Sequence, residues 1–216
     1  MIAKSFDTLL ENKEGVILKK AIFGGTFDPI HIGHIHIAYE ALYSLHLDKI
    51  IFMPAGNPPH KKNKKITNAK IRYDLVKRAI ESEVDFEISD YEINKKENSY
   101  TYETVELFSG LQRNIEWYFL IGVDSLMELD KWKNVEKIFN SCKIVVYNRA
   151  GFTAQEVAKK KLYIEQKFNK KIIYIDMPII DISSTHIRNN IKEGRQVNYL
   201  LPRGVEEIIR ANNLYK

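Results

Sequence analysis

The chain has 216 residues, 44% of them hydrophobic and 28% charged, which is the composition of a globular protein with a buried core. Its net charge of +5 suits a phosphate-bearing ligand as well as it suits nucleic acid. The one cysteine, Cys142, excludes an internal disulfide, and no apolar run reaches the ~18 residues that a membrane-spanning helix needs. Because the start of the chain also lacks a signal-peptide pattern, we expect a cytoplasmic protein with no membrane partner.

Residues 1–15 are typical of a short helix, with a weak apolar stripe formed by Phe6, Leu9 and Leu10. We expect a short N-terminal extension over residues 1–18, to which no function is assigned. The rest of the chain, residues 19–216, is expected to form a single domain.

The first candidate site is a glycine-rich turn between a buried strand and a helix. Residues 16–23 predict the strand, two glycines open the turn, and an apolar helical pattern starts at His34. Glycines let the backbone approach a phosphate, and the N–H groups of the first helical turn point at the anion. His31 and His34 share one helix face because they lie three residues apart, so each can donate a hydrogen bond to a phosphate oxygen. Gly33, between them, leaves room for a flat ligand.

A metal site is the alternative explanation for these histidines, because His31, His34 and His36 could supply three ring nitrogens. On a helix, however, the side chain of His36 turns away from the other two, since it follows His34 by two positions. A three-histidine site needs a converging geometry that this spacing does not provide. We therefore expect phosphate recognition, and no metal ligand from protein side chains.

The chain continues with alternating helical and buried-strand patterns. A helical spacing leads from the turn to an apolar strand over residues 49–54, and a strand–helix–strand unit of this kind implies parallel strands with a right-handed crossover. Similar patterns predict further strands at 86–88, 117–122, 143–147 and 172–175, and helices at 67–81 (capped by Thr67), after Thr101, at 154–169, at 183–193 and around Ile208. We expect an α/β fold, a Rossmann-like parallel sheet flanked by helices, with ligands beyond the carboxyl ends of the strands.

A cationic loop follows the strand at 49–54. Two prolines stiffen its first half, and four lysines between Lys61 and Lys65 make the second half positive. A solvated surface loop would account for the lysines alone. The position at the carboxyl end of a strand nevertheless places this loop beside the proposed phosphate site.

A second anion site is predicted near the C-terminal end of the chain. Ser183 or Ser184 caps a helix that ends at Gly194. Thr185 and Arg188 share one face of this helix, so that a hydroxyl and a guanidinium converge above its N-terminus. This combination suits the outer phosphates of a triphosphate. The alternative is an ordinary capped surface helix with an exposed arginine.

Both candidate sites resemble motifs of the nucleotidyltransferase superfamily. Residues 24–29 with His-Ile-Gly-His at 31–34 are similar to its first motif, which class I aminoacyl-tRNA synthetases also carry in part, and residues 182–188 are similar to its second. Within the superfamily the chain most resembles the bacterial nicotinate-nucleotide adenylyltransferases, from about Lys19 to Lys216. The resemblance implies that the adenylyl group of ATP is transferred to nicotinate mononucleotide. The products would be nicotinate adenine dinucleotide (deamido-NAD) and pyrophosphate, in NAD biosynthesis, with Mg²⁺ bound to the ATP.

The resemblance also implies roles for individual residues. Catalysis is expected from His31, His34 and Arg188. ATP binding is expected from Gly24, Gly25, Thr26, Phe27, Gly33, Ile182, Ser183, Ser184 and Thr185. Mononucleotide binding is expected from Asp28, Lys61, Tyr100, Thr101, Asp124 and Trp132.

Some of these residues have simpler explanations when taken alone. Asp124 and the Ser-Tyr-Thr stretch that ends at Thr101 could merely cap helices, and Trp132 could be a core residue. In the resembling family the Ser-Tyr-Thr helix start faces the nicotinate ring and its carboxylate. That role is physically sensible, because N–H groups at a helix N-terminus stabilise an anion.

Two other functions remain as alternatives. The first is a related adenylyl- or cytidylyltransferase that uses another acceptor, such as pantetheine phosphate or nicotinamide mononucleotide. The second is a non-catalytic nucleotide- or RNA-binding module. Because the lysines gather in one loop, with no aromatic and basic stripe that could track a strand, we expect no nucleic-acid partner. The oligomeric state stays open, a homo-oligomer included.

Overall fold

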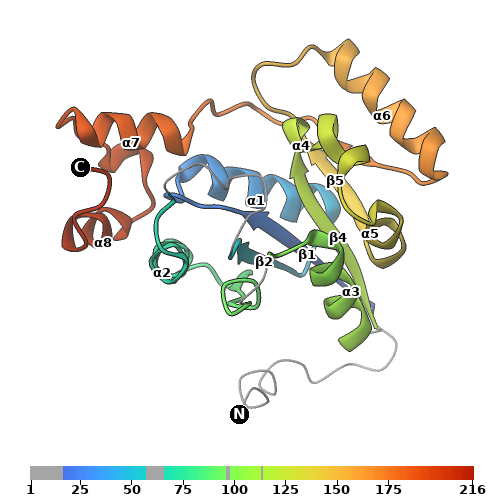
Figure 1. Ribbon diagram of the computed structural model, residues 1–216, viewed down its shortest axis with the longest axis horizontal. Helices are drawn as coiled ribbons and strands as arrows, with labels where there is room; N and C mark the ends of the chain where they lie inside the picture. Colours follow the sequence, from blue (N-terminus) through green and yellow to red (C-terminus); the bar gives the residue numbers. More distant parts are fainter. Residues whose placement is uncertain (1–16, 57–65, 96–97, 113) are drawn as a thin grey trace.

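The computed structural model describes residues 17–56, 66–95, 98–112 and 114–216. They form a six-stranded sheet in the order β3-β2-β1-β4-β5-β6, and every neighbouring pair of strands is parallel (Figure 1). The strands are β1 (Leu18–Gly25), β2 (Lys49–Pro54), β3 (Phe86–Ile88), β4 (Ile115–Gly122), β5 (Lys143–Tyr147) and β6 (Ile173–Ile175). In this order the chain winds outward in both directions from β1, which leaves a crevice at the carboxyl ends of β1 and β4.

Helices cover both faces of the sheet. They are α1 (Ile32–Leu45), α2 (Ala69–Ala79), α3 (Thr101–Leu111), α4 (Val123–Glu128), α5 (Val135–Ser141), α6 (Ala154–Phe168), α7 (Ser184–Lys192) and α8 (Val205–Ala211). The buried apolar residues of α1, α2, α7 and α8 belong to one cluster, and those of α3 to α6 belong to the other. None of the helices within the described ranges is long and apolar enough to cross a membrane.

The two clusters explain why the central strands are apolar throughout. Successive side chains of a strand point to opposite faces, so Phe23 lies in the cluster under α1 whereas Ile22 lies in the cluster under α3 to α6. Both side chains are buried, as expected where helices cover both faces of a parallel sheet. This packing holds the ends of β1 and β4, and the turns that follow them, in fixed positions.

The predicted fold class is confirmed, and Gly194 ends α7 with a positive φ of 71°. The predicted cap of α2 is wrong. Asn68 caps this helix through a 2.9 Å hydrogen bond from the Lys70 N–H to its side chain, because the helix begins at Ala69, two residues after Thr67. The helix predicted to start at His34 begins at Ile32, with His31 at the N-cap.

Other sequence predictions fall short of the structure or outside it. The short helix α5 had no counterpart among the predicted elements, and α4 was considered only as a helix that Asp124 could cap. Residues 1–15 and most of the cationic loop, Lys61 included, lie outside the described residues. The proposed boundary after residue 18 stays a prediction, although β1 already begins at Leu18.

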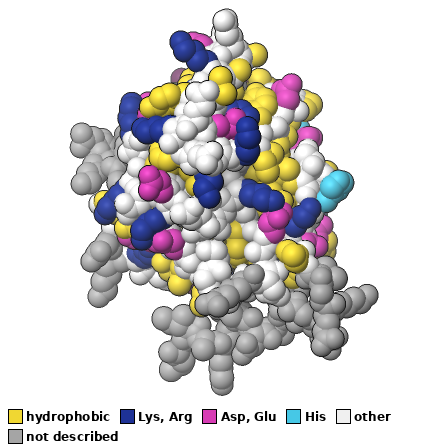
Figure 2. All heavy atoms as spheres, turned by 90° about the vertical axis from the view of Figure 1, so that its right-hand side faces the viewer, with side chains coloured by type: hydrophobic (Ala, Val, Ile, Leu, Met, Phe, Trp, Pro, Cys, Tyr) yellow, Lys and Arg dark blue, Asp and Glu magenta, His cyan; other side chains and the backbone are white. Residues whose placement is uncertain are grey.

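The face of the molecule in Figure 2 carries Lys and Arg side chains interspersed with Asp and Glu. Among the described residues, several charges form exposed pairs, for example Lys131 with Glu128 at 2.7 Å and Lys70 with Asp74 at 3.0 Å. Exposed pairs of this kind contribute little stability. The positive charges on this face are therefore locally balanced and do not form a continuous basic track.

Candidate active site

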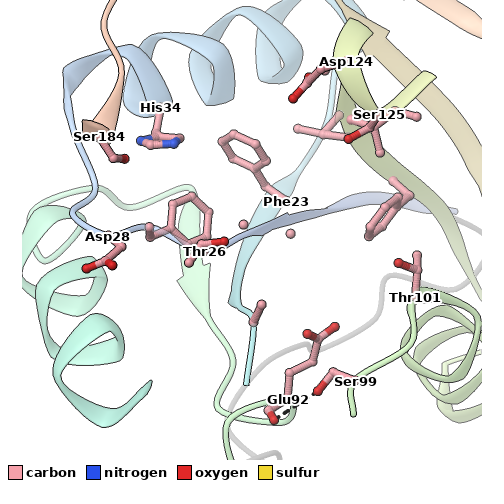
Figure 3. A pocket seen from close by; sticks show the side chains of 18 of the residues that line it. Phe23, Thr26, Asp28, His34, Glu92, Ser99, Thr101, Asp124, Ser125 and Ser184 are labelled. Carbon is pink, nitrogen blue, oxygen red and sulfur yellow. Dashed lines mark hydrogen bonds between the residues drawn. The ribbon is translucent and has the colours of Figure 1, made fainter. Parts of the chain in front are cut away.

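A cavity of about 740 Å³ opens at the carboxyl ends of β1 and β4. Its walls come from the turn between β1 and α1 and from the starts of α3, α4 and α7 (Figure 3). The predicted site residues that line it are Gly24, Gly25, Thr26, Phe27, Asp28, His31, His34, Tyr100, Thr101, Asp124, Trp132, Ser183, Ser184, Thr185 and Arg188. Gly33 and Ile182 line a smaller cavity behind the imidazoles. Of the predicted site residues, Lys61 alone lies outside the described residues.

The two imidazoles lie against each other, with ring centroids 3.7 Å apart. The backbone N–H of His31 donates to Nδ1 of His34 at 3.2 Å. Neutral His34 must therefore carry its proton on Nε2, which can donate to a ligand. Gly33 makes this arrangement possible, because a Cβ at that position would come within 3.1 Å of the His31 ring.

Both histidines are held neutral at physiological pH. Burial, followed by the charge of Arg149, lowers the pKa of His31 to about 4. Burial also lowers the pKa of His34 well below its usual value, with smaller contributions from His31 and Arg149. A phosphate bound in front of the rings would oppose these effects, because an anion favours the protonated form. The pair therefore consists of neutral donors that can take up a proton when an anion arrives.

The second motif docks directly on the first. Nη1 of Arg188 donates to the backbone carbonyl of Asp28 at 2.8 Å, and the hydroxyl of Ser184 donates to the carbonyl of Pro29 at 2.9 Å. A second guanidinium nitrogen of Arg188 donates to the Thr185 hydroxyl at 3.1 Å. In Figure 3, Ser184 lies beside His34 at one end of the cavity. The predicted convergence of an arginine and an imidazole pair on one space is therefore present.

A buried arginine that was not predicted ties the cavity walls together. Arg72, only 1% exposed, donates to the carbonyls of Thr26 at 2.7 Å and Thr67 at 2.9 Å. It also donates to the carbonyls of Ala55 at 2.6 Å and Gly56 at 3.1 Å. Arg72 thus links the turn after β1, the turn after β2 and the start of α2.

A signal for Arg72 was present in the sequence. It shares the buried stripe of its helix with Leu75, Val76 and Ala79, where a charged side chain is unexpected. A guanidinium is buried only where its N–H groups have hydrogen-bond acceptors. A buried arginine at this position therefore indicated acceptors nearby.

The opposite end of the cavity is formed by the start of α3 and the segment before it. Tyr100 is the N-cap of α3 with extended backbone, and Thr101 is its first residue. Glu92, also missed by the sequence analysis, lines this end together with Ser99 and Thr101 (Figure 3). Burial raises the pKa of the Glu92 carboxyl, which accepts a 2.8 Å hydrogen bond from the hydroxyl of Thr104.

A third side of the cavity carries Asp124 and Trp132. Asp124 lies in the first turn of α4 and forms an ion pair with Arg149 at 3.4 Å, in which both side chains are about half exposed. Arg149 follows β5 and also lines the cavity, a placement that the sequence analysis did not anticipate. Trp132 is half-buried and lines the cavity, so it is not a fully buried core residue.

Comparison with known proteins identifies the family to which this chain belongs. Residues 22–190 match the model of the family described as cytidylyltransferase-like. The chain is 57% identical over 203 residues to the "Probable nicotinate-nucleotide adenylyltransferase" of Clostridium kluyveri, which covers 93% of this chain and 100% of that protein. It is 54% identical over 198 residues to the protein of the same name in Clostridium novyi, covering 92% and 99%. The chain belongs to the nicotinate-nucleotide adenylyltransferase family.

Solved structures of similar proteins share this fold. The nicotinic acid mononucleotide adenylyltransferase of Plasmodium falciparum complexed with NaAD superimposes with a TM-score of 0.74 at 21% identity, covering 92% of this chain and 97% of that one. The same protein complexed with APC gives a TM-score of 0.71. At this identity the match supports the fold alone. The cavity of this chain lies at the carboxyl ends of the strands, where parallel sheets of this order bind ligands.

Proposed function

We propose that this protein transfers the adenylyl group of ATP to nicotinate mononucleotide, producing nicotinate adenine dinucleotide and pyrophosphate. One observation carries the proposal. The docking of α7 on the turn after β1 brings Arg188 and His34 to a single cavity, whose other end is formed by the N-terminus of α3. The names of the relatives at 57% and 54% identity support the same reaction.

In this reaction an oxygen of the mononucleotide's 5′-phosphate attacks the α-phosphorus of ATP. The bond between that phosphorus and the bridging oxygen breaks, and pyrophosphate leaves with the bonding electron pair. The attacking phosphate is already an anion at neutral pH, so no serine, cysteine or lysine nucleophile is required. The protein has to align two anions, and such positioning supplies up to ~7–11 kcal/mol of the barrier reduction.

The triphosphate end is assigned to the two motifs. His34 donates through Nε2, and His31 and Arg188 provide further donors towards the charge that builds up on the leaving pyrophosphate. The first-turn N–H groups of α1 and α7 add the positive ends of two helix dipoles. The remaining ATP contacts are assigned to Gly24, Gly25, Thr26, Phe27, Gly33, Ile182, Ser183, Ser184 and Thr185.

Mg²⁺ is proposed to arrive with ATP. The described residues contain no group of three His, Cys, Asp or Glu side chains that could hold a metal ion, so the phosphates would supply its ligands. When bound, Mg²⁺ neutralises part of the phosphate charge. Arg188, the imidazoles and the two helix N-termini then act on the charge that remains.

The acceptor end is assigned to the start of α3 and its neighbours. The N–H groups at Thr101 favour the carboxylate of nicotinate over the neutral amide of nicotinamide. Trp132 and Tyr100 offer rings for the pyridine, and Asp124 offers an acceptor for ribose hydroxyls. Asp28 lines the same cavity, and Lys61 stays an assignment from the family resemblance. We place the reaction in the cytoplasm, where free ATP is available.

The test is a direct comparison of acceptors. The protein is incubated with ATP, Mg²⁺ and either nicotinate mononucleotide, nicotinamide mononucleotide or pantetheine phosphate, and released pyrophosphate is measured. We expect nicotinate mononucleotide to give the highest kcat/KM and nicotinamide mononucleotide a value about fivefold lower, since a helix N-terminus favours an anion by ~1 kcal/mol. Faster turnover of pantetheine phosphate would contradict the proposal.

A further inference from the structure

The C-terminal end of the chain returns to the cavity wall through Tyr215. Its hydroxyl donates to Oδ1 of Asp28 at 2.7 Å, across 187 residues of sequence. Asp28 is only 6% exposed, so its carboxylate depends on protein donors. This contact is not explained by the roles assigned so far.

Asp28 is held from three directions. Its second carboxylate oxygen accepts the backbone N–H of Thr67 at 3.2 Å, and its backbone carbonyl accepts Nη1 of Arg188 at 2.8 Å. Tyr215 therefore acts on the same residue whose carbonyl orients the Arg188 guanidinium. A shift of the Asp28 backbone, once its carboxylate is no longer held, would move the carbonyl that aims Arg188 into the cavity.

The segment that carries Tyr215, just beyond α8, is held in place by other contacts besides the one with Asp28. The N–H of Leu214 donates to the carbonyl of Ile209 at 3.0 Å, just beyond the end of α8. Leu214 and Tyr215 both pack against the apolar cluster under α1 and α2. Burial and the charge of Asp28 raise the pKa of Tyr215, so its hydroxyl keeps its proton and donates throughout the physiological pH range.

We infer that Tyr215 is a positioning residue for adenylyl transfer, which fixes Asp28 and through it the guanidinium of Arg188. The inference rests on the proposed function, because the task assigned to Arg188 comes from it. Tyr215 itself does not line the cavity and is not assigned a contact with substrate.

The first test compares Tyr215→Phe with a matched control. Phenylalanine keeps the buried ring and removes only the hydroxyl, and thermal unfolding checks that the variant is folded. We expect kcat/KM for ATP to fall about tenfold through misalignment of Arg188. Tyr199→Phe removes the hydroxyl of a tyrosine that is 66% exposed and should match the wild type.

The second test asks whether Tyr215 acts through Arg188. Tyr215→Phe is introduced into an Arg188→Ala protein, and kcat/KM for ATP is measured for the single and double variants. We expect less than about a twofold further loss in the Arg188→Ala background, because the group to be positioned is gone. An equal loss in both backgrounds, or wild-type kinetics for the folded Tyr215→Phe protein, overturns the inference.

ATP affinity separates this inference from the proposed function. Calorimetric binding of ATP without an acceptor is measured for the wild type, Tyr215→Phe, Arg188→Ala and the double variant. If the wild type binds ATP but releases no pyrophosphate with nicotinate mononucleotide, the proposed function fails. The inference about Tyr215 then stands if ATP binding weakens in the Tyr215→Phe protein only when Arg188 is present, and falls if it does not.

Discussion

The two ends of the cavity are held in different ways. At the triphosphate end, buried or half-buried donors fix the turn after β1: Arg72 and Arg188 donate to backbone carbonyls, and Tyr215 donates to the Asp28 carboxylate. At the acceptor end the visible restraints are weaker. Asp124 forms an ion pair in which both partners are half exposed, and Nζ of Lys133 lies 4.3 Å from the ring centroid of Tyr100.

This difference follows the demands of the reaction. Negative charge shifts on the triphosphate during the transfer, and donors that are already in place stabilise that charge without reorganisation. The acceptor has only to be bound and aligned, which exposed and adjustable side chains can achieve. Variants at the triphosphate end should therefore cost stability or turnover, and variants at the acceptor end should mainly change KM.

The largest effect is expected for Arg72→Met. Loss of the guanidinium leaves the carbonyls of Thr26, Thr67, Ala55 and Gly56 without this donor, and an unpaired buried acceptor costs ~1–3 kcal/mol. We expect the free energy of unfolding to fall by about 3 kcal/mol or more in a urea titration.

Arg78→Met is the matched control, because Arg78 belongs to the same helix and forms ion pairs with Glu81 and Glu207 at the surface. That substitution should change the free energy of unfolding by less than about 1 kcal/mol. Equal losses in both variants would mean that Arg72 does not fix the cavity walls.

The next largest effect is expected for His34→Ala. This variant removes the Nε2 donor, and we expect kcat to fall by about a hundredfold or more, as for the loss of one aligned transition-state donor, with the fold intact. His46→Asn, at the exposed C-cap of the same helix, should leave kcat unchanged. Pyrophosphate release under saturating substrates is the measurement, and wild-type turnover in His34→Ala would remove this residue from the mechanism.

A somewhat smaller effect concerns stability in acid. The pKa of His31 is about 4 in the folded protein, against an ordinary value of 6.5, so the unfolded chain binds the proton more tightly. The contribution of neutral His31 to the free energy of unfolding is therefore fully present above pH 6.5 and is lost as the pH drops towards 4. Relative to His31→Asn, the wild type should lose about 2 kcal/mol of unfolding free energy between about pH 7 and pH 4.5. Parallel losses in the two proteins would show that His31 is not held neutral.

The smallest effect is expected for Trp132→Ala at the acceptor end. Loss of a stacking ring costs about 1 kcal/mol, so the KM for nicotinate mononucleotide should rise several-fold. The KM for ATP should stay the same, because Trp132 lies away from the two phosphate motifs. Phe152→Ala, which removes an exposed aromatic ring outside the cavity, serves as the control. A change confined to the KM for ATP would reverse the assignment of the two ends.

The parts of the site that were predictable from the sequence are those with local patterns. The strand before Gly24, the spacing of His31 and His34, and the helix that carries Arg188 each follow from neighbouring residues and turn chemistry. Their convergence was expected from the family resemblance, in which the two motifs serve one reaction.

Long-range contacts were not predictable in the same way. Nothing near Tyr215 indicates that its hydroxyl reaches Asp28, and nothing near Thr67 shows that its N–H is taken by the same carboxylate. Arg72 was detectable as a charge on a buried stripe, but not its four carbonyl partners. These partners are set by the packing of α2 and the tail on the sheet, which local patterns do not encode.

The joint between α7 and the turn after β1 has one more consequence. Arg188 and Ser184 both bind main-chain oxygens, those of Asp28 and Pro29, and not the side chains there. Every amino acid supplies the same carbonyl, so these two hydrogen bonds follow the path of the backbone. The side chain of Asp28, held by Tyr215 and Thr67, in turn keeps that path in place.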